Sequence, residues 1–138
     1  MIQPWLERTE LLLGAEKLEK LRQAHVLIVG VGGVGAYAAE MVVRAGVGRL
    51  TLADADEVNP TNINRQLVAL HSTVGRPKVE VMAERIRDIN PNCTVRVHQC
   101  LYLPENADSF DFEGYDFVID AIDTVSAKVE IAVRCSSL

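Results

Sequence analysis

The stretch from His25 to Gly46 constrains the fold of this chain more than any other. A short apolar run with β-branched residues, HVLIVG (25–30), leads into the glycine pattern GVGGVG (30–35). The residues that follow, VGAYAAEMVVRAG (34–46), have the composition of a helix. A glycine turn between a buried strand and a helix presents free N–H groups at the helix start to an anion. The stretch therefore predicts a strand–turn–helix unit that binds phosphate.

The glycines of this turn have different expected tasks. Gly30 permits the tight turn, and Gly35 lets the helix pack closely against the sheet. Between them, Gly32 and Gly33 let the backbone approach a phosphate. Asp54 lies nineteen residues after Gly35, at the end of the next strand, where a carboxylate can bind ribose hydroxyls. The alternatives are a turn that serves packing alone and a solvated aspartate, and the two features together disfavour both.

Strands and helices alternate along the rest of the chain. Apolar or alternating runs predict further strands at 49–54, 94–99 and 115–123. Amphipathic spacing predicts helices at 4–23, at 77–90 and from 124 onward. The last strand is apolar enough to be a central one, and Gly14 is expected to divide the first helix.

This alternation is typical of an α/β fold of the Rossmann-like, doubly wound kind. It has a mainly parallel sheet with helices on both faces, and the expected strand order is 3-2-1-4. We expect a helical segment over residues 1–24 and an ATP-binding domain over residues 25–138. The last helix ends where the alternation calls for another strand, so we expect the N-terminal part of a longer protein.

Composition narrows the class of protein further. The chain has 138 residues, enough for one domain with a core, and no apolar run long enough to span a membrane, so we expect a cytoplasmic protein. Cys93, Cys100 and Cys135 form no CxxC pair, which favours free thiols over a zinc or redox site. The net charge of −5 argues against a surface that binds nucleic acid throughout, but allows a local basic site.

The loop over residues 55–73 is long for a compact domain, and such loops are often functional. ATP carries more negative charge than the glycine turn alone can neutralise. Arg65 can bind a phosphate through two parallel hydrogen bonds, and Lys78 supplies a point charge. Further candidates in the same region are one more cation and three neutral donors: Arg76, Asn62, Asn64 and Gln66.

The segment DAID places two carboxylates at the end of the last expected strand, at the edge where the other strands also end. Mg²⁺ prefers one or two carboxylates together with phosphate oxygens. We expect Asp123 to hold Mg²⁺ and Asp120 to be structural; a helix N-cap is the alternative for Asp123. For Asp56, a turn-stabilising side chain is at least as well supported as a ligand contact.

Four motifs in this order, GVGGVG, DADEVNPTNINRQ, VGRPK and DAID, resemble the ThiF/MoeB/HesA family of ubiquitin-activating-like adenylyltransferases. The resemblance covers almost the whole chain. It implies ATP and Mg²⁺ positions at Gly32, Asp54, Asn62, Arg65, Lys78 and Asp123. It also implies a homodimer in which Arg8 of one subunit joins Arg65 and Lys78 around the triphosphate of the other. A helix-surface arginine is the alternative for Arg8.

Within the family, RTELLLG, the long loop and VIDAIDT are most similar to tRNA threonylcarbamoyladenosine dehydratases. The resemblance implies an enzyme that uses ATP to activate a carboxylate on a modified adenosine of tRNA and cyclises it. AMP and pyrophosphate are the by-products. Three alternatives stay open: an enzyme that adenylates the C-terminus of a sulfur-carrier protein, an NAD- or FAD-dependent oxidoreductase, and a non-catalytic Rossmann scaffold.

Overall fold

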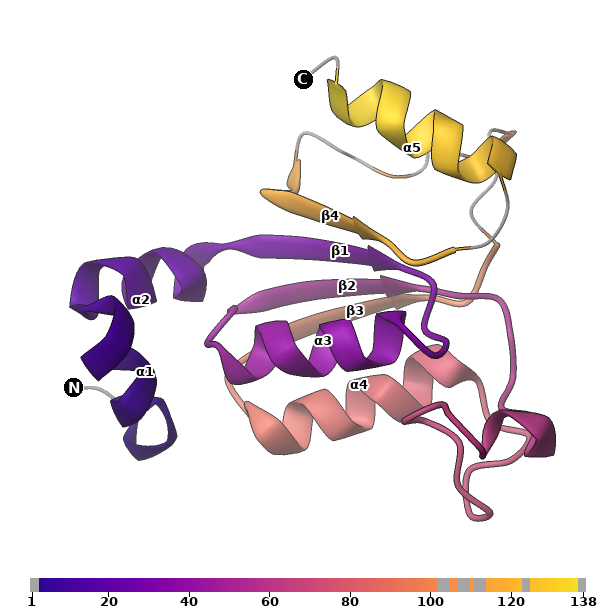
Figure 1. Ribbon diagram of the computed structural model, residues 1–138, viewed down its shortest axis with the longest axis horizontal. Helices are drawn as coiled ribbons and strands as arrows, with labels where there is room; N and C mark the ends of the chain where they lie inside the picture. The colour runs from indigo at the N-terminus through magenta and orange to yellow at the C-terminus, as the bar shows by residue number, and fades with distance from the viewer. Residues whose placement is uncertain (1–2, 102–104, 107–109, 111–113, 123–124, 137–138) are drawn as a thin grey trace.

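The computed structural model describes residues 3–101, 105–106, 110, 114–122 and 125–136. Its centre is a parallel sheet of four strands in the order β3-β2-β1-β4, which confirms the expected order (Figure 1). The strands are β1 (His25–Val29), β2 (Arg49–Ala53), β3 (Thr94–His98) and β4 (Phe117–Asp120). All run in one direction, so their carboxyl ends meet at one edge of the sheet.

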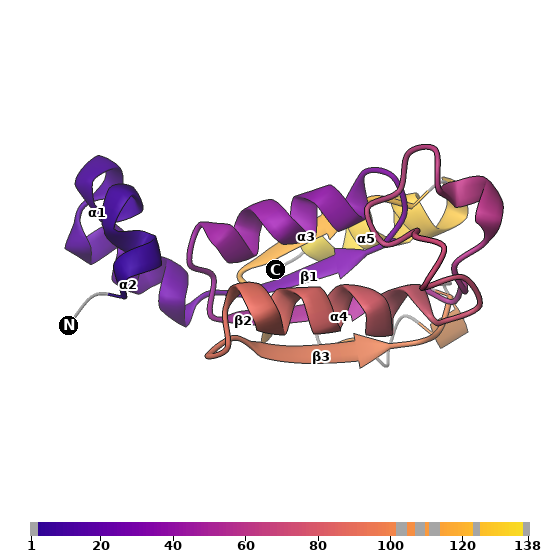
Figure 2. The same ribbon diagram turned by 90° about the horizontal axis from the view of Figure 1, so that it is seen from below.

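Helices cover both faces of this sheet, as a doubly wound fold requires. α3 (Gly35–Arg44) and α4 (Lys78–Ile89) lie on one face, and α5 (Val125–Ser136) lies on the other (Figure 2). Beneath α3 and α4, the core includes six fully buried side chains: Ile28, Val43, Leu50, Leu52, Met82 and Ile86. A smaller cluster on the α5 face contains Leu27, Val29, Phe110, Ala127 and Ile131. The expected Rossmann-like architecture is therefore confirmed.

The N-terminal segment forms a short 3₁₀ turn, η1 (Pro4–Leu6), and two helices, α1 (Glu7–Leu13) and α2 (Ala15–Gln23). Gly14 separates the helices with a φ of +89°, so the predicted division at this residue is confirmed. Both helices lie beyond the amino-terminal ends of the strands (Figure 1). The split into domains at residues 24 and 25 stays a prediction.

The prediction that the fourth strand is central is wrong for the described sheet. β4 pairs with β1 alone and lies at the edge, and Phe117 is 71% exposed. The strand reads as apolar because Ile119 packs into the core under α3 and α4, while Val118 packs into the cluster on the α5 face. Packing on both faces makes a strand apolar whether or not it has a neighbour on each side.

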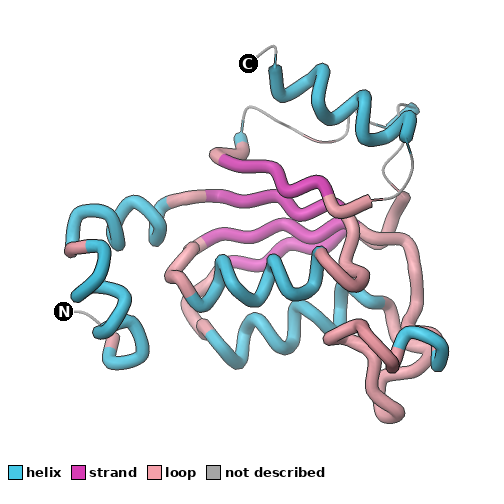
Figure 3. The backbone as a smooth tube through the Cα atoms, in the orientation of Figure 1, coloured by secondary structure: helices cyan, strands magenta, loops and turns pink. Residues whose placement is uncertain are grey.

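The connections at the carboxyl ends of the strands gather at one end of the molecule (Figure 3). They include the glycine turn after β1 and the long loop after β2, which contains a short 3₁₀ helix, η2 (Pro60–Asn62). Among the described residues, no helix is both long and apolar enough to cross a bilayer.

Candidate nucleotide-binding site

The glycine turn joins the end of β1 to the start of α3. Gly30 has a φ of +97°, and a Cβ atom there would lie 2.5 Å from the carbonyl oxygen of Ala121. At Gly35, an added Cβ would lie 1.7 Å from the carbonyl oxygen of Gly30. Gly30 must therefore be glycine for the turn to lie this close to the chain after β4, and Gly35 must be glycine for the start of α3 to lie this close to the turn.

This geometry gives a direct test with a matched control. We expect Gly35→Ala to lower the free energy of unfolding by about 3 kcal/mol, because backbone atoms must move to admit the methyl group. The melting temperature should fall by about 10 °C in a thermal scan. Gly33→Ala should leave it almost unchanged, because no atom lies within 4 Å of a Cβ there. Equal stability of the two variants would contradict the close packing.

Asp54 connects the glycine turn to the loop after β2. Its Oδ2 accepts a hydrogen bond of 2.7 Å from the backbone N–H of Val31, and its Oδ1 accepts one of 2.7 Å from the N–H of Asp56. An ionised carboxylate has about four acceptor sites, so it can still accept hydrogen bonds from ribose hydroxyls. The turn-stabilising side chain is thus Asp54, whereas the sequence suggested Asp56 for that role.

Lys78 is the first residue of α4 and is only 5% exposed. Its backbone N–H donates to the carbonyl oxygen of Asp56, and its Nζ lies 3.9 Å from Oδ2 of the same residue, a long ion pair. A cation at a helix start also lies at the positive end of the helix dipole. An ammonium group on a nearly buried side chain, with only this long ion pair among the described residues, favours a bound anion beside it.

The loop after β2 brings two further side chains to the same place. Gln66 is buried, and its Oε1 has no hydrogen-bond partner among the described residues, while its Nε2 lies close to Gly32. Arg65 is exposed, and its Nη1 donates to Oδ1 of Asn64 at 2.8 Å and to the carbonyl oxygen of Thr61 at 3.3 Å. A buried amide oxygen without a partner costs free energy that a ligand donor can recover.

Asn62 stabilises the start of this loop. Its Oδ1 accepts a hydrogen bond of 2.9 Å from the backbone N–H of Asn59. The side chain of Asn59 in turn accepts from the N–H of Thr61, so the two asparagines cap η2 reciprocally. Asn62 therefore fixes the loop backbone in addition to lining the site.

These groups surround one cavity of about 600 Å³ at the carboxyl ends of β1, β2 and β4. Eight of the predicted site residues line it: Gly30, Gly32, Gly33, Asp54, Asn62, Arg65, Gln66 and Lys78. Sequence reasoning missed the wall formed by Cys100, Leu101, Ala121 and Ile122. Their position just after β3 and β4 is the only signal that could have found them, because their side chains carry no distinctive chemistry.

The model of the ThiF family matches residues 6–138 of this chain. The chain belongs to the ThiF family. The sequence is 50% identical over 128 residues to the tRNA threonylcarbamoyladenosine dehydratase of Bacillus subtilis, which covers 93% of this chain and 50% of that protein. The Escherichia coli enzyme of the same name is 46% identical over 134 residues, 95% of this chain and 50% of that protein.

Solved structures of ThiF proteins show the same fold. The crystal structure of the E. coli tRNA threonylcarbamoyladenosine dehydratase TcdA in complex with ATP superimposes with a TM-score of 0.93. It is 45% identical to this chain and covers 99% of this chain and 58% of that one. The molybdopterin-synthase adenylyltransferase of Salmonella typhimurium is a more distant relative, 38% identical over 87% of this chain and 48% of that protein. The chain thus spans about half the length of these relatives.

Among the described residues, four other candidates do not line the cavity: Arg8, Gly35, Asn64 and Arg76. Gly35 lies behind the turn, where it packs α3 on the sheet. Arg76 forms an exposed ion pair with Glu84 on α4, so it is not a ligand of the cavity in this structure. Arg8 is exposed on α1, at the opposite end of the strands (Figure 1). Asp123 lies outside the described residues, so its role as a metal ligand stays a prediction.

Asp120 has the structural role that was expected. Its Oδ1 lies 3.1 Å from Nζ of Lys128 on α5 and accepts a hydrogen bond of 3.2 Å from the N–H of Ile122. The pair joins the end of β4 to α5 and fixes the segment that forms one wall of the cavity.

The three cysteines are free thiols, as predicted. Burial raises the pKa of the Cys93 thiol to about 11 and raises the pKa values of Cys100 and Cys135 as well. Cys100 lines the cavity, but a raised pKa keeps its thiol protonated at neutral pH and disfavours a role as a nucleophile.

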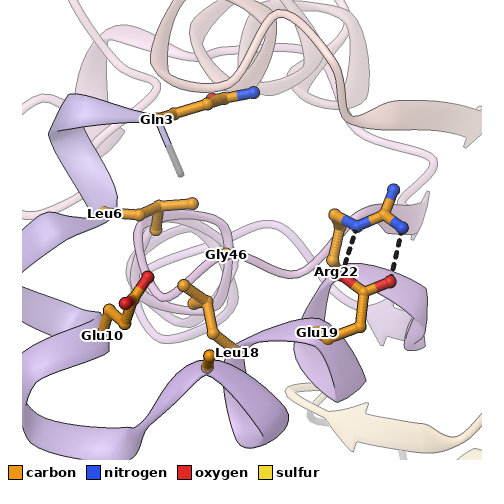
Figure 4. Close-up of a pocket in the computed structure, with 8 residues that line it drawn as sticks. Gln3, Leu6, Glu10, Leu18, Glu19, Arg22 and Gly46 are labelled. Atoms are coloured by element: carbon orange, nitrogen blue, oxygen red, sulfur yellow. Dashed lines mark hydrogen bonds and ion pairs between the residues drawn. The ribbon is translucent and has the colours of Figure 1, made fainter. Parts of the chain in front are cut away.

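A second hollow of about 540 Å³ lies between α1, α2 and Gly46, which follows α3 (Figure 4). Its charged lining comprises Glu10, Glu19 and Arg22, and Arg22 Nε donates to Glu19 at 2.8 Å. One paired arginine and two carboxylates do not suit a triphosphate. The cavity beside the glycine turn is therefore the candidate nucleotide site.

Proposed function

We propose that the complete protein is a tRNA threonylcarbamoyladenosine dehydratase that uses ATP. The carboxylate of the modified nucleoside attacks the α-phosphorus of ATP, forms an acyl adenylate and displaces pyrophosphate. Attack by the neighbouring carbamoyl group then closes a ring and releases AMP, which carries away the carboxylate oxygen, so that the nucleoside loses the elements of one water. Relatives of this name that are 46–50% identical over most of the chain support the substrate.

The observation that carries the ATP site is the nearly buried Lys78, with its single long ion pair, beside the glycine turn. Arg65 and the Oε1 of Gln66, which has no hydrogen-bond partner in the part of the chain that the structure describes, line the same cavity. Asp54 would bind the ribose hydroxyls. Lys78 and Arg65 would neutralise charge on the β- and γ-phosphates as pyrophosphate leaves. Positioning and charge neutralisation suffice for this step, so no nucleophilic side chain is required.

Mg²⁺ is the metal that we propose for this site, with Asp123 as its carboxylate ligand. When bound, the ion would neutralise phosphate charge. The described residues form no group of three or more His, Cys, Asp or Glu side chains that could hold a metal without other ligands. A single carboxylate such as Asp123 fits Mg²⁺, which takes one or two carboxylates and completes its shell with phosphate oxygens and water.

We also propose a cytoplasmic homodimer in which Arg8 acts on the partner's triphosphate. α1, which carries Arg8, lies beyond the amino-terminal ends of the strands, whereas the cavity lies at their carboxyl ends (Figure 1). Leu11 and Leu12, which are 84% and 83% exposed, lie three and four residues after Arg8 and so share its side of α1. An exposed apolar patch beside a cation is the kind of surface that a second subunit would cover.

Thermal unfolding of the complete protein tests the nucleotide class. Saturating Mg-ATP should raise the melting temperature by several degrees, since a ligand at about 100 times its Kd contributes about 2.7 kcal/mol. NAD and FAD should produce no shift, because neither supplies the triphosphate that Arg65 and Lys78 would bind. A shift with NAD and none with Mg-ATP would favour the oxidoreductase, and no shift with any nucleotide would favour the non-catalytic scaffold.

Adenylation of a sulfur-carrier protein is the second candidate. The molybdopterin-synthase adenylyltransferase and the enzymes named adenylyltransferase and sulfurtransferase MOCS3 support it at 35–38% identity. Incubation of the complete protein with ATP and each substrate separates the two. The dehydratase should release AMP with tRNA that carries threonylcarbamoyladenosine, and the tRNA nucleoside should become lighter by one water.

A further inference from the structure

Two adjoining hollows lie at the amino-terminal ends of the strands, whereas the start of α4 and the nucleotide cavity lie at the carboxyl ends. The smaller, of about 230 Å³, is lined by His25, Arg49, Thr94, Arg96, Gly114 and Tyr115. The larger, of about 680 Å³, shares Arg49 and extends to Lys17 and Lys20 on α2. We call the four cations of these hollows the basic strip: Lys17, Lys20, Arg49 and Arg96.

The basic strip lacks the acidic partners that other cations of the chain have. Arg22, Arg44, Arg76, Arg85, Lys128 and Arg134 each form an ion pair with a carboxylate. Among the described residues, no Asp or Glu lies within ion-pair distance of the four cations of the strip. Asp116 is the one carboxylate among the described residues that line the two hollows, and its Oδ2 accepts a hydrogen bond from the backbone N–H of His25. In a chain with a net charge of −5, four cations beside one carboxylate are a local concentration of positive charge.

The sheet holds these side chains on one surface. Arg49 pairs in register with Thr94, and Thr51 pairs with Arg96, so the two arginines project from the same face of β2 and β3. Arg49 Nη2 donates to the carbonyl oxygen of Gln23 at 2.9 Å, which links the sheet to the end of α2. Burial lowers the pKa of His25, repulsion from Arg49 and Arg96 lowers it further, and attraction from Asp116 opposes this lowering.

We infer that the basic strip binds the phosphate backbone of RNA, an inference that rests on the proposed tRNA substrate. The strip and the nucleotide cavity lie at opposite ends of five-residue strands, about 16 Å apart along the sheet. A single nucleotide cannot contact both places, but a polymer with its modified nucleoside in the cavity can. Several separated cations on an open surface suit contacts to successive phosphates, which hold an RNA without reading its sequence.

The test measures the affinity of the complete protein for tRNA that carries threonylcarbamoyladenosine, over a range of salt concentrations. Each lost phosphate contact should cost about fivefold in affinity at 0.1 M salt. The double variant Arg49→Gln/Arg96→Gln should therefore bind about 25-fold more weakly, with a shallower salt dependence. The matched control Arg44→Gln/Arg87→Gln removes the same charge from α3 and α4 on the other face of the sheet and should bind as the wild type does.

The Kd for Mg-ATP should be unchanged in both double variants, which verifies that they are folded. The single variant Arg96→Gln removes an exposed side chain that pairs with no described carboxylate, and it should show the intermediate loss. Equal tRNA affinity of the two double variants would overturn the inference while the proposed function stands. A wild-type protein that binds Mg-ATP but neither binds nor cyclises the tRNA would overturn the proposed tRNA substrate and the inference with it.

Discussion

Replacement of Lys78 by methionine should abolish almost all adenylation and leave the fold intact. In the complete protein with the proposed tRNA substrate, we expect ATP–pyrophosphate exchange to fall by about 10³-fold, as when a preorganised group that stabilises developing charge is removed. The Lys78 side chain is only 7% exposed and lines the cavity, and the side chains of Arg65 and Gln66 cannot take its place at the start of α4.

Stability should not follow activity in this variant. Methionine has a similar length, and an apolar side chain in place of a buried ion is often neutral or stabilising. The partner carboxylate of Asp56 is largely exposed, so it can be hydrated once the lysine is gone. Arg87→Met on the same helix is the control, because Arg87 is exposed and lies outside the cavity. Exchange at the wild-type rate in Lys78→Met would refute the assignment of this lysine.

Arg65→Ala should have the second largest effect, about a 100-fold loss of pyrophosphate exchange. Arg65 is held by Asn64 and by the carbonyl oxygen of Thr61, and no carboxylate among the described residues pairs with it. Its guanidinium is therefore available for a phosphate, with limited competition inside the loop.

The companion variant Arg65→Lys distinguishes charge from geometry. Lysine keeps the positive charge but cannot form two parallel hydrogen bonds to one phosphate, so it should restore only part of the lost activity. Because Arg65 is exposed, neither variant should change the melting temperature by more than a degree or two. Undiminished exchange in Arg65→Ala would count heavily against adenylation at this cavity.

Sequence patterns predicted those parts of the site whose positions follow directly from the backbone fold. Strand–helix alternation implies the strand order, and parallel strands then bring the glycine turn, Asp54 and the loop with Arg65 to one edge. The sequence also predicted Lys78 at this edge, although its burial depends on how Asp56 and α4 pack. Composition cannot report such packing, because a lysine at a helix start is usually exposed.

Other features depend on contacts that no local pattern encodes. Arg76 was a plausible phosphate ligand because of its position between Arg65 and Lys78. In the structure it instead forms an ion pair with Glu84, eight residues away on α4. β4 was expected in the centre because both of its faces are apolar, and apolarity gives no information about lateral neighbours. The cavity wall at Cys100 and Ile122 comes from segments that follow β3 and β4 and meet only in the folded molecule.

The two backbone hydrogen bonds to Asp54 have a consequence for how ATP would bind. Because one carboxylate accepts hydrogen bonds from Val31 of the turn and Asp56 of the loop, both segments are ordered before a ligand binds. The loss of conformational entropy is then part of folding and does not reduce the affinity for the nucleotide. This part of the site should therefore be preorganised for ATP, and the backbone amide of Val31 should show similar hydrogen-exchange protection in the free and ATP-bound protein.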